Sequence, residues 1–147
     1  MRRAFFALAL FALGACQPLV HYYHYQPVDP LGWALTDTLL FTVPVSSNPQ
    51  PHNVSLGIRF REQQRYRDLY LVLEQRLQHG AALRDTLHLH LANERGRWQA
   101  RGVVLHEHEV AATPARLDTL NPTTFLVYHV QGPQIITGIT EVGLKVE

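Results

Sequence analysis

The chain has 147 residues, of which 46% are hydrophobic, and its 13 Lys and Arg residues against 12 Asp and Glu give a formal net charge of +1. This length suits one domain with a buried core, and the balanced charge excludes the strongly basic surface of a nucleic-acid-binding protein. Without Arg2 and Arg3 in the first segment, 11 of the 13 basic residues remain, so the rest of the chain is not basic at all.

The first sixteen residues have the order of an export signal. Met1-Arg2-Arg3 is positive, residues 4–13 are apolar, and Gly14-Ala15 supplies the small residues that a signal peptidase requires. The twelve uncharged residues between Arg3 and Cys16 are too few for a transmembrane helix, which needs roughly 20 apolar residues. We therefore expect residues 1–15 to be a cleaved secretory signal.

The end of this signal points to lipid attachment. Leu13-Gly14-Ala15-Cys16 resembles the bacterial lipobox, in which an aliphatic residue and two small residues precede a cysteine. The resemblance implies S-diacylglycerol and an N-acyl chain on Cys16, with membrane lipid as its partner; several chains anchor durably where one is marginal. The alternative is a plain secreted protein, yet Cys16 is the only cysteine and stands at the one position that uses it. Without a second cysteine, the domain has no internal disulfide.

The remaining chain has the pattern of β-strands. In residues 54–61 the apolar side chains alternate with Ser, Gly and Arg, which is the period of a half-buried strand. Similar alternation recurs at Leu69 to Leu73, Leu87 to Leu91, Val103 to Leu105 and Phe125 to Val127. Leu71 to Leu83 can also be interpreted as a short helix. Turn-rich segments separate these stretches, which predicts an all-β fold, an antiparallel β-sandwich of about seven to nine strands. We expect residues 16–30 to be the lipidated N-terminus with a short tether, and residues 31–147 to form a single domain.

Histidine is the obvious candidate for metal chemistry, with nine copies. His88 and His90 form one pair, His106 and His108 another, and residues i and i+2 share one face of a strand. Two such pairs on neighbouring strands would suit Zn²⁺. The simpler interpretation places all four on a solvent-facing side, opposite the leucines, with no metal, and we favour it because no third motif of ligand spacing joins them.

Two further features have alternative interpretations. Trp33, Trp98 and Tyr66 suit a carbohydrate-binding face, although tryptophan in a small β-domain more often belongs to the core. The tripeptide Asp-Thr-Leu occurs three times and resembles the acceptor pattern of O-glycosylation on exported Bacteroidetes proteins. Equally, Asp can close a turn and Thr can begin a strand. The candidate acceptors are Thr38, Thr86 and Thr119.

Several segments together resemble one known family. In chain order they are a Tyr-rich strand at residues 21–25, Trp33, the strand 53–61 with Arg59, Asp68-Leu69-Tyr70-Leu71, Gly96-Arg97-Trp98 and the closing segment 138–147. Their order, together with the lipobox, is similar to that of the gliding motility lipoprotein GldH family of the Bacteroidetes.

The resemblance implies a non-enzymatic envelope lipoprotein that supports gliding and the associated type IX secretion machinery, with other proteins of that machinery as partners. We expect no catalytic residues and no cofactor, and outer-membrane residence because Gln17 is not the inner-membrane retention aspartate of enteric lipoproteins. A lipid-anchored binding module for carbohydrate or metal, using an aromatic or His-rich β-face, is the alternative.

The two predicted modifications are tested by intact-mass measurement of protein from native membranes. We expect the mass of a chain beginning at acylated Cys16, with hexose increments if the threonines are glycosylated. A Cys16→Ala variant should leave the membrane fraction, because it has no sulfur to carry diacylglycerol. An unlipidated native mass, or a Cys16→Ala variant that stays membrane-bound, would contradict the lipidation; a mass without hexose would contradict the glycosylation.

Overall fold

The computed structural model describes residues 20–77 and 80–147, so the expected signal peptide and Cys16 lie outside the described residues. Across the described part the fold is essentially all-β, with ten strands. The strands are β1 (Tyr22–Pro27), β2 (Trp33–Ala34), β3 (Leu39–Val43), β4 (Val54–Phe60), β5 (Asp68–Arg76), β6 (Ala82–His90), β7 (His106–Ala111), β8 (Thr123–His129), β9 (Ile135–Ile136) and β10 (Ile139–Val146).

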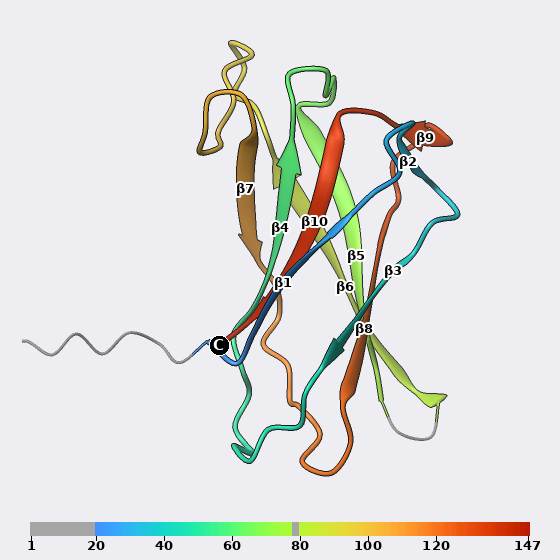
Figure 1. The fold of residues 1–147 in the computed structure, drawn as a ribbon, viewed down its shortest axis with the longest axis vertical. Helices are drawn as coiled ribbons and strands as arrows, with labels where there is room; N and C mark the ends of the chain where they lie inside the picture. The colour runs from blue at the N-terminus through green and yellow to red at the C-terminus, as the bar shows by residue number, and fades with distance from the viewer. Residues whose placement is uncertain (1–19, 78–79) are drawn as a thin grey trace, which may run out of the picture.

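Eight of the strands form two four-stranded sheets. The first sheet has the order β1-β10-β4-β7 and the second β3-β8-β5-β6, while the two-residue strands β2 and β9 pair separately. All the pairings are antiparallel. In Figure 1, β4 and β10 lie in front of β5 and β6, and buried residues of both sheets form one core cluster. The predicted antiparallel β-sandwich is confirmed.

Alternation along each strand builds this core. In β4, Val54, Leu56, Ile58 and Phe60 are at most 2% exposed, whereas Arg59 faces outward. Burial of one such large apolar side chain stabilises the fold by about 1.5–3 kcal/mol. The alternation predicted for Phe125 and Val127 is confirmed in the same way in β8.

The antiparallel order gives the sandwich two distinct ends. Tyr22 pairs with Val146, which also pairs with Val54, so the start of β1 and the end of β10 lie together. We call this the Tyr22 end; the letter C, which marks the end of the chain, lies there in Figure 1. The connections 61–67, 91–105 and 130–138 lie at the opposite end, which we call the far end.

Three expectations from the sequence need correction. The domain begins before residue 31, because β1 is paired with β10 over its whole length and therefore belongs to the sandwich. Residues 103–105 form no strand: Val103 and Val104 are 83% and 77% exposed in the connection between β6 and β7. The helix considered at Leu71 to Leu83 is wrong, since the stretch holds the end of β5, up to Arg76, and the start of β6, from Ala82, and these two strands pair with each other.

Two interior histidines differ in how their ring nitrogens are satisfied. His129 is fully buried; its Nε2 lies 3.2 Å from the Trp33 carbonyl oxygen, and the Gln131 N–H donates to its Nδ1 at 3.3 Å. Burial lowers the pKa of His129, which keeps the ring neutral. In contrast, both nitrogens of buried His106 have no hydrogen-bond partner among the described residues.

This difference predicts opposite effects of the same substitution. His129→Leu removes the hydrogen bonds that the ring makes with a buried carbonyl and a partly buried N–H, and should lower the free energy of unfolding by about 1–3 kcal/mol. His106→Leu removes two unsatisfied nitrogens at similar side-chain volume and should preserve or raise stability. Urea denaturation at neutral pH measures both. Equal losses in the two variants would show that the nitrogens of His106 are satisfied.

Candidate functional site

The outer face of the first sheet carries an aromatic ring seated on glycines. Register places Tyr25 opposite Gly143, and Gly143 opposite Gly57, in one row across β1, β10 and β4. A Cβ atom added to Gly143 would lie 2.6 Å from Cζ of the Tyr25 ring, and one added to Gly57 would meet the same side chain. The two glycines therefore form the floor on which the ring lies.

Arg59 covers this ring and links three strands. Its guanidinium carbon lies 3.9 Å from the centroid of the Tyr25 ring. Its Nε donates to Glu107 Oε2 at 2.8 Å and its Nη1 to Glu141 Oε2 at 2.9 Å. Those two hydrogen bonds raise the pKa of Arg59, and burial is the main cause that raises the pKa of Tyr25. The Arg59 cluster, as we call these residues with Gly57 and Gly143, is held in one arrangement.

The chemistry of the Arg59 cluster is structural. A cation over an aromatic face contributes about 0.5–1 kcal/mol at an exposed site, and partly exposed ion pairs contribute a similar or smaller amount. The guanidinium of Arg59 already pairs with the carboxylates of Glu107 and Glu141, which belong to the same sheet. The cluster therefore presents a rigid polar surface across β1, β10, β4 and β7.

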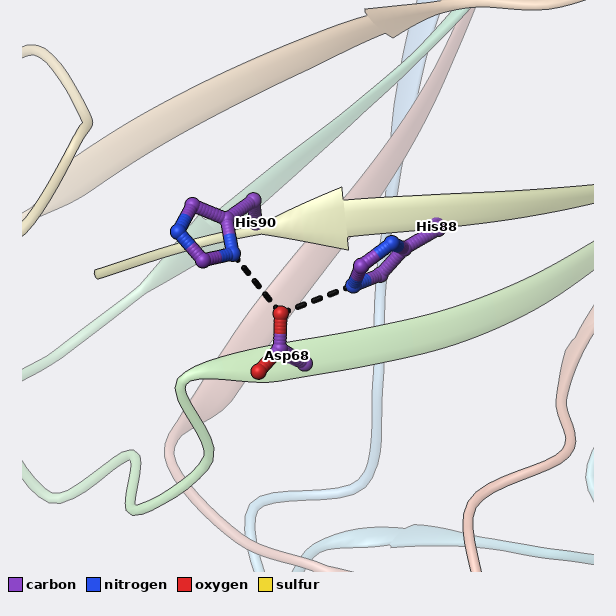
Figure 2. Close-up of side chains that lie close together, drawn as sticks. All are labelled: Asp68, His88 and His90. Atoms are coloured by element: carbon purple, nitrogen blue, oxygen red, sulfur yellow. Dashed lines mark hydrogen bonds and ion pairs between the residues drawn. The ribbon is translucent and has the colours of Figure 1, made fainter. Parts of the chain in front are cut away.

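A second cluster lies on the outer face of the second sheet, at the far end. Asp68 pairs directly with His90 across β5 and β6, and His88 lies two residues earlier on the same face. His88 Nε2 and His90 Nδ1 each lie 2.7 Å from Asp68 Oδ1. Figure 2 shows both rings converging on that one oxygen. We call this the Asp68 cluster.

Two neighbours hold the Asp68 cluster in place. Arg67 Nε donates to the second carboxylate oxygen, Oδ2, at 2.9 Å. The Tyr70 ring stacks on His88 with 4.6 Å between centroids and an interplanar angle of 11°. Hydrogen bonds from His90, Arg67 and His88, in that order of effect, hold the pKa of Asp68 well below its usual range. Because an ionised carboxylate only accepts, each histidine must carry a proton on the nitrogen that faces it.

The structure does not bring the two histidine pairs together, because β6 and β7 belong to different sheets. The expectation that all four face solvent is wrong for His106, which is 7% exposed and packs with ring centroids 5.3 Å from Phe60 and 5.9 Å from Trp98. His108 Nδ1 lies 2.7 Å from the Gln99 carbonyl oxygen. Because His106 lies in the core while His88 and His90 gather around Asp68 on the outer face, the two pairs do not form one zinc site.

The remaining candidate residues have simpler environments. Trp33 is 1% exposed, and Trp98 is half-buried with its ring 5.0 Å from Phe60, so both tryptophans belong to the core or its margin. In the Asp-Thr-Leu tripeptides, Asp37 and Asp118 each accept a backbone N–H from a residue two or three positions away, as turn-forming aspartates do. Asp85 instead lies within β6 and accepts the N–H of Thr113, far along the chain. The three threonines that follow them are exposed, namely Thr38, Thr86 and Thr119.

Sequence reasoning missed Asp68 as the partner of the histidines. The contact arises because Asp68 begins a strand that pairs with the strand of His88 and His90. The register of that pairing cannot be inferred from a single sequence. The contact of Tyr25 with Gly57 and Gly143 was also missed. A glycine in the middle of an otherwise regular strand is the available signal, because it often marks close approach of another group.

Comparison with known proteins gives one family. A model of the family described as GldH lipoprotein matches residues 20–146, which is nearly all of the described domain. A search of curated proteins gives no significant match. Within residues 20–77 and 80–147, no helix is long and apolar enough to cross a membrane.

Because the Tyr25 ring lies directly on Gly143, we expect a side chain at position 143 to disturb the packing of the ring. Gly143→Ala should lower the free energy of unfolding by about 1–3 kcal/mol, the usual result of overpacking, because the new methyl group must displace the ring and the guanidinium above it. Gly132→Ala is the matched control: a Cβ there has nothing within 4 Å. Chemical denaturation measures both.

A double-mutant cycle identifies the cause. In a Tyr25→Ala background the loss from Gly143→Ala should disappear, because the methyl group then has room. A Gly143→Ala protein as stable as the wild type, or a loss that persists without the tyrosine, would contradict this account of the ring.

Proposed function

The chain belongs to the GldH lipoprotein family, and from that premise we propose that it supports gliding motility and the associated type IX secretion machinery without being an enzyme. The observation that carries the proposal is the extent of the family match, which runs from just before β1 to the last residue of β10. The family places the protein in the envelope on a lipid anchor. We propose the outer membrane as its location.

The position of β1 indicates how the anchor and the domain act together. Tyr22 is the sixth residue after Cys16 along the chain, and an extended chain spans at most about 3.3–3.6 Å per residue. Acylation of Cys16 would therefore hold the Tyr22 end within roughly 20 Å of the lipid attachment, on the same principle. The far end would then face away from the membrane that holds the protein.

Exposed apolar residues support a protein partner at the far end. Val103 and Val104 are adjacent in one connection and 83% and 77% exposed. Exposed apolar groups that lie together mark interaction sites more often than scattered ones do. We propose that this connection, residues 91–105, contacts another envelope protein of the gliding or secretion machinery.

Gene deletion in the source organism tests the proposed function. We expect surface spreading to stop and export of type IX cargo to fall, and the wild-type gene to restore both. A Cys16→Ala gene should fail to restore them, because its product leaves the membrane. Unchanged spreading and unchanged export in the deletion strain would remove the proposal.

Two matched variants test the partner contact. Val103→Asp with Val104→Asp should fold normally, since both side chains are exposed, but should lose spreading and in-cell cross-links to the machinery. Leu120→Asp is the control, because Leu120 is 82% exposed in a connection at the Tyr22 end. Full restoration by the double variant would place the contact elsewhere on the domain.

A further inference from the structure

We propose that Asp68, His88 and His90 form a binding site for Zn²⁺. Their ligand atoms, one from each residue, all lie within 4.8 Å of one another. They come from two paired strands of one sheet rather than from loops, so the backbone fixes their spacing. The proposal goes beyond the envelope role of the protein and does not depend on it.

The three residues supply the ligand types that zinc prefers. Zinc binds imidazole nitrogen at about 2.0–2.1 Å and carboxylate oxygen at about 2.0–2.2 Å, usually in tetrahedral geometry. Zinc sites with three protein ligands keep the fourth position for water or another molecule. Two histidines and one aspartate on a solvent-facing strand pair match that arrangement, with the fourth position open outward.

Little movement is needed to admit the ion. Tetrahedral bonds of about 2.0 Å place ligand atoms roughly 3.3 Å apart, whereas Asp68 Oδ1 now lies 2.7 Å from each facing nitrogen. The side chains of His88 and His90 are 50% and 44% exposed, so their rings are free to turn outward by that amount. On binding, each histidine turns an unprotonated nitrogen to the ion: a neutral ring carries its proton on the other ring nitrogen instead, and a doubly protonated ring releases one proton to water.

The residues around the three ligands affect how the ligands are oriented and how tightly Zn²⁺ would bind. Arg67 holds Oδ2 and leaves Oδ1 for the ion, and Tyr70 supports the face of the His88 ring. Such outer contacts orient metal ligands. The positive charge of Arg67 opposes a divalent cation, although its side chain is 55% exposed and is screened by water. We therefore expect micromolar affinity, weaker than that of a closed four-ligand site.

Isothermal titration of the full chain with zinc chloride tests the site. The protein is purified without a His tag, treated with chelator and dialysed before titration near neutral pH. We expect one Zn²⁺ per chain, with at least tenfold weaker binding in His90→Ala and in Asp68→Asn. His108→Ala is the matched control, since His108 also lies on a strand but in the other sheet, and it should bind as the wild type does.

NMR of the histidine side chains keeps the test independent of the variants. Zinc added to the wild-type chain should shift the signals of His88 Nε2 and His90 Nδ1 and leave the other imidazoles unchanged. Absence of binding at a several-fold excess of zinc, shifts confined to other histidines, or equal weakening by His108→Ala would each overturn the proposal and leave the cluster as a hydrogen-bonded surface feature.

Discussion

The apolar contact between the inner faces of the two sheets is the interaction on which the rest of the domain depends. The only cysteine, Cys16, precedes the first strand, so no disulfide ties the strands together. Residues from both sheets, such as Phe60 in the first and Phe125 in the second, are at most 1% exposed and belong to one cluster. Because this contact fixes which side of each strand turns inward, it also fixes which side chains meet water.

On the outward sides of the same strands, the pairing register decides which polar and aromatic side chains lie next to one another. On the first sheet, pairing of β1, β10 and β4 brings a tyrosine over two glycines and an arginine over the tyrosine. On the second sheet, pairing of β5 with β6 brings an aspartate beside two histidines. The first cluster satisfies its charges internally and stiffens the sheet. The second leaves two imidazoles half-exposed beside a carboxylate, the ligand types of the zinc site proposed above.

Strand patterns were readable wherever one side of a strand is clearly apolar. The alternation of residues 54–60 predicted β4 and its buried side correctly. The weaker alternation at Val103 to Leu105 was misleading, because an isolated apolar pair carries no information about a partner strand. His106 was misplaced for a related reason: in His-Glu-His-Glu both alternating sets are polar, so the sequence does not indicate which set faces the core.

The sequence by itself determined the all-β class, most of the strands and the family, and the prediction of an export and lipidation signal rests on it alone. Each of these depends on residues that are close together or in fixed order. Only the tertiary structure decided that β6 and β7 lie in different sheets, that His106 is interior, and that Asp68 joins His88 and His90. The reason is physical. Strand pairing and register are set by contacts between residues far apart in the chain, and a shift of one residue turns every side chain to the other face.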